Sequence, residues 1–136
     1  MVREIVHDPV ILARKSEEAG PSDLPVAHDL MDTLRANLDR CVGMAANMIG
    51  EHKRIIAIAR GPMVVAMLNP KIISRFGEYE AEEGCLSLEG TRKVKRFRSI
   101  RLSWQDMQMK GHIGTLDGFQ AQVVQHEIDH CDGILV

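Results

Sequence analysis

Aromatic residues, cysteines and long apolar runs are all scarce in this sequence. Aromatic residues make up only 4% of the 136 residues, so the core must be built from aliphatic side chains and methionine. The three cysteines are odd in number and widely spaced, which excludes a disulfide framework and favours a reducing cytoplasm. No apolar run approaches the roughly 18 residues of a membrane-spanning helix, and the N-terminus lacks the apolar region of a signal peptide.

Charge and length narrow the possibilities further. The net charge is −2, which argues against DNA or another nucleic acid as the main partner. Hydrophobic residues make up 45% and charged residues 26%, the balance of a soluble globular protein. A chain of 136 residues suffices for one hydrophobic core and is too short for two, so residues 1–136 are expected to form a single domain.

Proline and glycine divide the first third of the chain. Residues 1–22 are expected to form an irregular arm, because Pro9 and Gly20-Pro21-Ser22 interrupt it. Apolar residues then recur at helical spacing over 23–40, which predicts a helix. The next segment, 41–50, is rich in small residues, which suits either a tight buried turn or a close approach of the backbone to a ligand.

The middle of the chain is typical of antiparallel strands. Two short apolar runs at 54–59 and 63–68 predict an antiparallel pair, which Asn69-Pro70 should end. Most of the glutamates of 78–83 are expected to be solvated. The basic stretch 92–101 lies in a further predicted strand, and its side chains are expected on an exposed face; a contact with an acidic chain terminus or RNA is the alternative.

The motif with the clearest chemistry lies near the C-terminus. Residues 125–130 read Gln-His-Glu-Ile-Asp-His. Residues four apart lie on one face of a helix, so His126 and His130 can bind one metal ion. Glu127 projects nearby and can act as a base on a metal-bound water.

The residues before this motif predict that its helix is buried. Asp117 is a suitable N-cap, and Phe119, Val123 and Val124 form an apolar stripe. This pattern argues against the alternative of an exposed polar face that carries two histidines. A third ligand that prefers the same metals is available upstream in Cys85.

Three segments in this order resemble the peptide deformylases, which remove the formyl group from the N-terminal methionine of nascent bacterial proteins. The segments are Cys41-Val42-Gly43-Met44-Ala45-Ala46-Asn47-Met48, Glu83-Gly84-Cys85-Leu86-Ser87 and Gln125-His126-Glu127-Ile128-Asp129-His130. The second and third match the family motifs in full, and the resemblance extends from about Ile5 to Leu135. It implies an α+β fold in which antiparallel strands wrap around a central metal-binding C-terminal helix.

The expected core is aliphatic, with the helix over 23–40 packed on the outside of the strands. It comprises Leu34, Leu38, Ile56, Ile58, Val65, Leu68 and Val123. Cys41 and Cys131 are expected to be small buried hydrophobic residues. Asp129 is expected to make an ion pair with a partner that the sequence does not identify.

The resemblance assigns the metal site to Cys85, His126 and His130. These three ligands leave a fourth tetrahedral position for water, as in catalytic rather than structural sites. Sulfur and nitrogen ligands suit Zn²⁺ or Fe²⁺ but not Mg²⁺ or Ca²⁺. The resemblance implies Fe²⁺, with Zn²⁺, Ni²⁺ or Co²⁺ as replacements. The sequence does not choose among the transition metals.

The same resemblance assigns the remaining roles. Glu127 is the general base, and it then passes its proton to the leaving amine. The backbone N–H of Leu86 and a glutamine side chain stabilise the oxyanion in the family. Peptide contacts are expected at Gly43, Met44 and Gly84, with a formyl-Met peptide or nascent chain as the substrate and the ribosome as a further partner.

Two departures from the family pattern bear on these expectations. Where the family motif has its first glycine and its glutamine, this chain has Cys41 and Met48. A thioether cannot donate a hydrogen bond, so slow deformylation is expected. Asn47 is not expected to compensate, because adjacent residues of an extended strand point to opposite faces. The chain also stops at Val136, whereas many family members carry a further C-terminal helix that helps ribosome attachment.

Two alternatives stay open at this point. One is a deformylase-like enzyme with a different amide substrate, because Met48 alters the oxyanion pocket. The other is a non-catalytic metal-binding or peptide-binding protein. The intact Glu127 argues against the second, because a pure binding site has no use for a base beside a metal-bound water.

Overall fold

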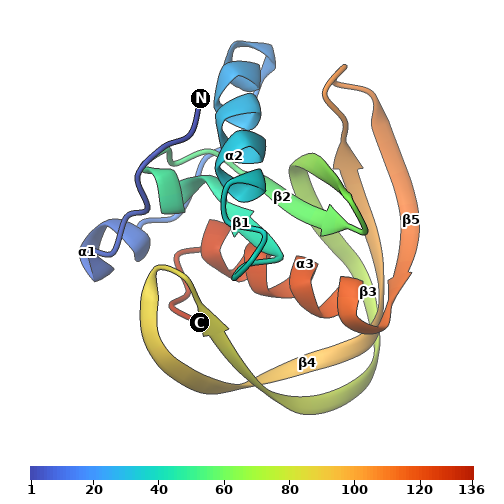
Figure 1. Cartoon of the computed structure of the whole chain (residues 1–136). Coiled ribbons are helices and arrows are strands. Elements are labelled where there is room, and N and C mark those ends of the chain that lie inside the picture. The colour runs from blue at the N-terminus through green and yellow to red at the C-terminus, as the bar shows by residue number, and fades with distance from the viewer.

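The computed structural model describes all 136 residues and contains one five-stranded antiparallel sheet. The strands are β1 (Gly43–Ala45), β2 (Ile55–Arg60), β3 (Met63–Cys85), β4 (Leu88–Gln105) and β5 (Gly111–Asp117), and they pair in chain order (Figure 1). The helices are α1 (Pro9–Leu12), α2 (Leu24–Arg35) and α3 (Gly118–Cys131), with 3₁₀ turns at Pro21–Asp23 and Ala46–Ile49. This arrangement confirms the expected α+β class. No helix is long and apolar enough to cross a membrane.

Strand β2 lies between two hydrophobic cores, because successive side chains of a strand point to opposite faces. Ile55 and Ala57 belong to the core that includes α2, whereas Ile56 and Ile58 belong to the core that includes α3. The sheet therefore separates the two longer helices, and α3 has a face of the sheet to itself.

Most of the expected core residues are buried. Leu34, Ile56, Ile58 and Leu68 expose at most 1% of their surface, and Val65 and Val123 are half-buried against the α3 core. Leu38 is 38% exposed, contrary to expectation. The reason is that α2 ends at Arg35 rather than at Arg40, which leaves Leu38 in the turn that follows the helix.

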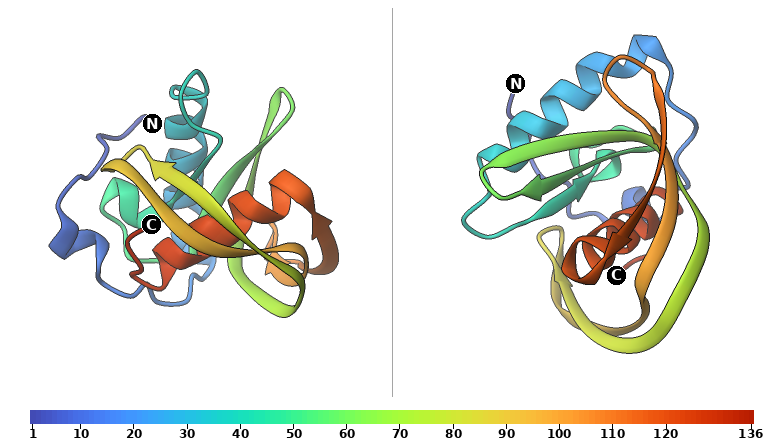
Figure 2. Two further views of the ribbon diagram at one scale, coloured as in Figure 1. Left: turned by 90° about the horizontal axis from the view of Figure 1, so that it is seen from below. Right: turned by 90° about the vertical axis from the view of Figure 1, so that its right-hand side faces the viewer.

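Strands β3 and β4 form a long hairpin that curls around α3 (Figure 2). The expectation that Asn69-Pro70 ends the strand is wrong, because β3 continues to Cys85. Asn69 adopts a left-handed conformation (φ 51°), and the pairing with β4 shifts register between Leu68 and Lys71. Such an irregularity bends a strand without ending it, and it tolerates a proline that has no N–H to pair. The bent strand carries Cys85 to a position over α3.

The N-terminal arm is more regular than expected. Residues 1–22 contain α1 and the start of the turn at Pro21, and Val6 N–H donates to the carbonyl of Met48 over 2.8 Å. Pro9 and Pro21 each occupy the first turn of a short helix. Proline suits that position because the N–H that it lacks has no partner there in any helix, so these prolines begin helices instead of breaking the chain.

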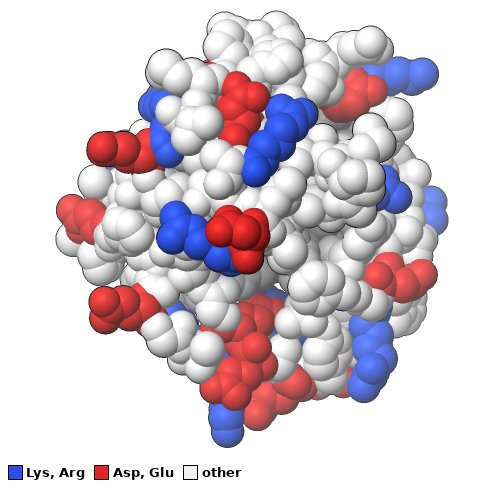
Figure 3. Space-filling view, viewed as in Figure 1, with Lys and Arg blue, Asp and Glu red and all other residues white.

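Charged side chains of opposite sign face one another across the β3–β4 hairpin. Glu80 pairs with Lys95, and Glu82 pairs with Lys93, in the strand register. Acidic and basic side chains lie side by side over the face shown in Figure 3. The outward-facing part of the basic stretch 92–101 therefore forms the expected charge-balanced strand surface.

Candidate metal centre

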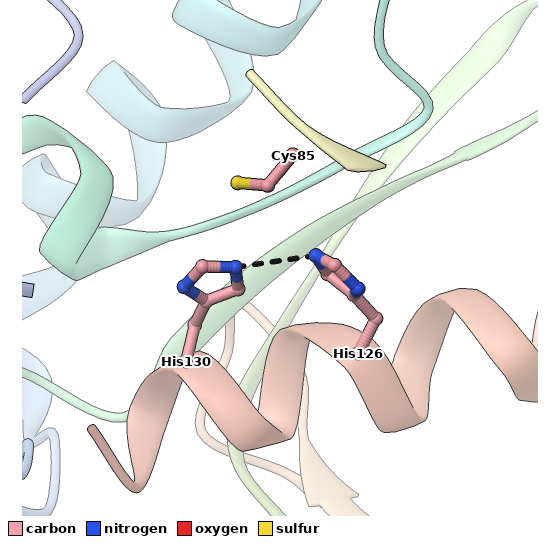
Figure 4. A group of neighbouring side chains, drawn as sticks. All are labelled: Cys85, His126 and His130. Atoms are coloured by element: carbon pink, nitrogen blue, oxygen red, sulfur yellow. Dashed lines mark hydrogen bonds between the residues drawn. The ribbon is translucent and has the colours of Figure 1, made fainter. Parts of the chain in front are cut away.

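Cys85, His126 and His130 converge at one point between the end of β3 and α3. One potential ligand atom from each residue lies within 4.8 Å of the other two. The Nε2 atoms of the two histidines are 3.2 Å apart, and the Cys85 side chain projects above them (Figure 4). The structure therefore brings together the three residues that the sequence singles out as metal ligands.

The orientation of α3 follows from its sequence. His126 and His130 are one turn apart, and their ring centroids are separated by 4.9 Å. Val124 and Ile128 pack into the hydrophobic core on the sheet side of the helix, so the imidazoles cannot rotate away without exposing these apolar side chains. Asp117 occupies the expected N-cap position, although its side chain makes no capping hydrogen bond.

Phe119 does not bury the helix as expected. It is 64% exposed, in the first turn of α3. Val124, one turn and a half further along, is fully buried and anchors the helix instead. Phe119 lies at the edge of a cavity, which explains why its ring is not covered by other parts of the chain.

Glu83 is buried beside His126 and is the exception to the solvation expected for most of the acidic stretch. Its Oε1 lies 2.8 Å from Nδ1 of His126, and both carboxylate oxygens accept hydrogen bonds from Arg96. Burial favours the neutral form of Glu83, but hydrogen bonds from His126, Arg96 and Gln122 outweigh it and lower its pKa to about 2. An ionised Glu83 holds the ring of His126 so that Nε2 faces His130.

Arg96 joins β4 to α3 and is the exception to the exposed basic face. It is 4% exposed, with nitrogen atoms 2.7 Å from Oε1 of Glu83 and 2.7 Å from Oδ2 of Asp129. Arg96 is thus the partner of Asp129 that the sequence does not identify. Sequence reasoning missed both Arg96 and Glu83. Strand alternation is the signal that could have found Glu83, because it lies two residues before Cys85 and shares its face.

A cavity of about 260 Å³ lies beside the converging side chains, and Gly43, Gly84, Leu86 and Glu127 line it. Glu127 is 4% exposed, and its Oε1 has no hydrogen-bond partner. Burial raises the pKa of Glu127 to about 7. A buried carboxyl with a pKa near neutrality, in the wall of a cavity, is suited to accept and release a proton.

The two histidines have opposite pKa shifts. Burial disfavours the charged form of His126, but its hydrogen bonds with Cys85 and Glu83 prevail and raise its pKa to about 10. Burial, together with the charge of His126, lowers the pKa of His130 to about 3. Without a metal the pair therefore carries a single positive charge near neutral pH, because two charged imidazoles at this distance repel each other.

Residues of the first motif are placed partly against expectation. Residues 46–49 form a 3₁₀ turn instead of an extended strand. Met48 is 1% exposed, and its Sδ accepts a hydrogen bond from the N–H of Ala45 over 3.5 Å. Met44 and Met48 are both buried in the α2 core and are absent from the cavity wall, whereas Gly43 and Gly84 line it.

Asn47 ties the end of α3 to the N-terminal arm. Its side-chain amide donates to the carbonyl of Leu12 over 3.2 Å and to the carbonyl of His130 over 2.9 Å. The amide is thus engaged with the backbone, fully buried and absent from the cavity wall. The expectation that Asn47 does not stand in for the missing glutamine agrees with this geometry, although the reason is the turn and not strand alternation.

The two remaining cysteines differ in surroundings. Cys131 is 1% exposed, and burial raises the pKa of its thiol to about 12, as expected for a core residue. Cys41 was expected to be a core residue too, but it is only half-buried and lines the cavity beside Glu127.

Comparison with known proteins points to one family. The family model described as polypeptide deformylase matches residues 2–136. A peptide deformylase of Clostridium beijerinckii is 48% identical over 136 residues, with 100% of both chains covered, and one of Dictyoglomus thermophilum is 37% identical over 100% of this chain and 91% of that protein. The crystal structure of a peptide deformylase from Acinetobacter baumannii with bound Met-Ala-Ser superimposes with a TM-score of 0.88 at 28% identity, covering 99% of this chain and 97% of that one.

These matches span the entire sheet and α3, including the segments that carry the converging cysteine and histidines. The chain belongs to the peptide deformylases, a family of metal-dependent hydrolases that remove the N-formyl group from nascent peptides.

Proposed function

We propose that this protein deformylates N-terminal formylmethionine at the site formed by Cys85, His126, His130 and Glu127. The observation that carries the proposal is the convergence of one sulfur and two imidazole nitrogens within 4.8 Å beside a cavity. The buried Glu127 in the wall of that cavity supports a reaction and not binding alone. A cytoplasmic location and a contact with the ribosome follow from the proposal, because formylated chains emerge there.

The donor set fits a transition metal. One thiolate and two neutral imidazoles are the ligands preferred by Fe²⁺ and Zn²⁺, and Ni²⁺ or Co²⁺ can replace them. The contact between Glu83 and Nδ1 of His126 supports the fit, since metal-binding histidines commonly donate their second nitrogen to a carboxylate. When bound, the metal supplies Lewis-acid activation of water near neutral pH.

Glu127 carries the proton through the reaction. Its deprotonated carboxylate accepts a proton from the attacking water, and the protonated form then gives it to the leaving amine. Burial supports both steps, because it raises the pKa of Glu127 to about 7 and brings the two forms to similar population at neutral pH. Formate and a free N-terminal amine are the products.

Leu86 and the glycines of the cavity wall bind the substrate. Leu86 lies in the turn between β3 and β4, where its N–H can donate to the oxyanion that forms at the formyl carbon. Gly43 and Gly84 line the cavity from two sides, and their lack of side chains leaves room for a peptide backbone. Met44 contributes to peptide binding only by supporting Gly43 from the core.

Slow turnover is part of the proposal. Met48 occupies the position of the family glutamine, its sulfur accepts a hydrogen bond from Ala45, and a thioether offers no donor to an oxyanion. Loss of one oxyanion donor typically lowers kcat by about 10²–10³. Turnover well below that of a family member that carries the glutamine is therefore expected.

The test is an anaerobic preparation with metal analysis, assayed on formyl-Met-Ala-Ser. The proposal is supported if the wild-type protein binds one transition metal ion per chain and turns over the substrate, and if this turnover is lost in Glu127→Ala. Bound metal with no turnover above the Glu127→Ala control supports the non-catalytic alternative. Turnover of other formylated or acetylated amides, but not of formyl-Met-Ala-Ser, supports the alternative of a different substrate.

A further inference from the structure

The edge strand β1 turns the backbone of Gly43 toward the cavity. β1 lies at the edge of the sheet and pairs only with β2. The carbonyl of Val42 accepts a hydrogen bond from the N–H of Ala59 over 2.9 Å, so Val42 faces β2. Backbone groups of consecutive residues in a strand point to opposite sides, and the N–H and C=O of Gly43 therefore point to the free edge.

Gly43 is also the part of β1 that lies against the proposed base. A Cβ added to Gly43 would lie 2.8 Å from Oε2 of Glu127. The free edge of a strand offers carbonyl groups to the N–H groups of an extended peptide. A formyl-Met chain that brings its formyl carbon to Glu127 thus brings the formamide N–H to the carbonyl of Gly43.

That carbonyl already has a donor within this chain. The thiol of Cys41 donates to the Gly43 carbonyl, with 2.9 Å between Sγ and O. Cys41 lines the same cavity as Glu127, whose buried Oε1 has no hydrogen-bond partner. Burial raises the pKa of Cys41 to about 11, so the thiol keeps the proton that this hydrogen bond requires.

We propose that Cys41 is a specificity-determining residue that caps the substrate-binding edge: its thiol donates to the Gly43 carbonyl and competes there with the substrate's formamide N–H. The inference rests on the proposed deformylase function. A thiol is a weak donor, so the cap is displaced readily and weakens substrate binding without blocking it. Most of its effect falls on KM, because the cap opposes binding and is absent once the substrate is bound.

Kinetics of three side chains at position 41 test the cap. With metal-loaded protein and formyl-Met-Ala-Ser, Cys41→Ala should lower KM about threefold because the donor is lost, and Cys41→Ser should raise KM about threefold because a hydroxyl is the stronger donor. The value of kcat should change by less than about twofold in both. A purely steric role gives the opposite order for serine, which is smaller than cysteine. A KM for Cys41→Ser equal to or below the wild-type value overturns the proposal.

A substrate without the formamide N–H provides the matched control. In the 2-formyloxy analogue, an ester oxygen replaces the amide nitrogen, and the cap then competes with no hydrogen bond. The dependence of KM on residue 41 should shrink to less than about 1.5-fold with this ester. If the order of KM values persists with the ester, the thiol acts on some other part of the substrate and the proposal is wrong.

Infrared spectroscopy gives a readout that needs no turnover. The S–H stretching band of Cys41, assigned by its loss in Cys41→Ala, should move to the position of a free thiol when formyl-Met-Ala-Ser saturates the metal-loaded Glu127→Gln variant. A band that does not move under saturation contradicts the cap. Absence of turnover in the wild-type protein would overturn the proposed function itself, whereas turnover with the wrong order of KM values would overturn the cap alone.

Discussion

At the scale of single residues, the proposal of slow turnover depends on Met48. The side chain is almost fully buried, and its sulfur accepts a hydrogen bond from the N–H of Ala45. Met48 belongs to the core that includes α2 and does not line the cavity. The proposal therefore predicts that a hydrogen-bond donor restored at this position speeds turnover.

Met48→Gln should raise kcat for formyl-Met-Ala-Ser by about 10²–10³, because it restores an oxyanion donor. Steady-state kinetics at matched metal content measures the effect. Met48→Leu is the control, since it is similar in size and equally unable to donate, and it should keep the wild-type rate. If Met48→Gln leaves kcat unchanged, position 48 does not contribute to oxyanion binding.

At the same scale, the buried carboxyl of Glu127 affects the stability of the folded protein. Burial raises its pKa from 4.5 to about 7 in the folded protein. A carboxyl whose pKa is raised by folding binds a proton more tightly in the folded state. Its ionisation therefore destabilises the metal-free fold as pH rises from 4.5 to about 7, and the full penalty is present above that range.

Glu127→Gln should stabilise the metal-free protein by a few kcal/mol at pH 8 and have little effect at pH 5, where the native carboxyl is already neutral. Urea denaturation in the presence of a chelator at both pH values measures the difference. An equal stability change at pH 5 and pH 8 would show that the carboxyl is not desolvated in the metal-free protein.

At the scale of elements, β1 approaches α3 closely at Gly43, beside the proposed base Glu127. A Cβ at Gly43 would lie 2.7 Å from Cγ1 of Val123 and 2.8 Å from Oε2 of Glu127, both too short for real contacts. Only glycine lets the strand lie this close to the helix. The cavity is thus bounded by an edge strand on one side and by Glu127 on the other.

Gly43→Ala should push Glu127 out of position and lower kcat/KM by at least about tenfold, with a loss of roughly 1–3 kcal/mol in stability from overpacking. Gly20→Ala is the matched control, because a Cβ there meets no atom within 4 Å. Kinetics and denaturant unfolding of both variants measure the two effects. Wild-type activity in Gly43→Ala would mean that β1 yields without disturbing the base.

At the scale of the whole molecule, the proposed metal ligands come from segments that are far apart in the chain. Cys85 ends β3, and the two histidines lie more than 40 residues later in α3, so an ion held by all three ties the hairpin to the helix. Any ligand that binds only the folded state stabilises it, by about 4 kcal/mol when its concentration is 1,000 times its Kd.

Removal of the metal with a chelator should lower the midpoint of thermal unfolding, and added Zn²⁺ should restore it. In Cys85→Ala most of this metal-dependent increment should disappear, because one of three ligands is lost. Cys131→Ala should lose some stability through a core cavity but retain the increment, since Cys131 is buried away from the site. Equal increments in the two variants would exclude Cys85 as a ligand.

Short-range sequence patterns predicted the elements that place the site. The spacing of four between His126 and His130, the apolar stripe of α3 and the paired runs of β2 and β3 all depend on neighbours within a turn or a hairpin. The family motifs added Cys85, at a distance that spacing alone could not bridge. Errors arose where a local signal for a break was overridden, as at Pro70, where a bulge bends β3 and the strand continues.

The sequence by itself determined which side chains share a face, because helix and strand periodicities are properties of the backbone. Only the tertiary structure decided which faces meet. Arg96 is one basic residue among several in its strand, and it is buried because the curled hairpin places it between Glu83 and Asp129. The burial of Arg96 and its ion pairs depend on Glu83 and Asp129, which lie 13 and 33 residues away in the chain. No local sequence pattern encodes contacts over such separations.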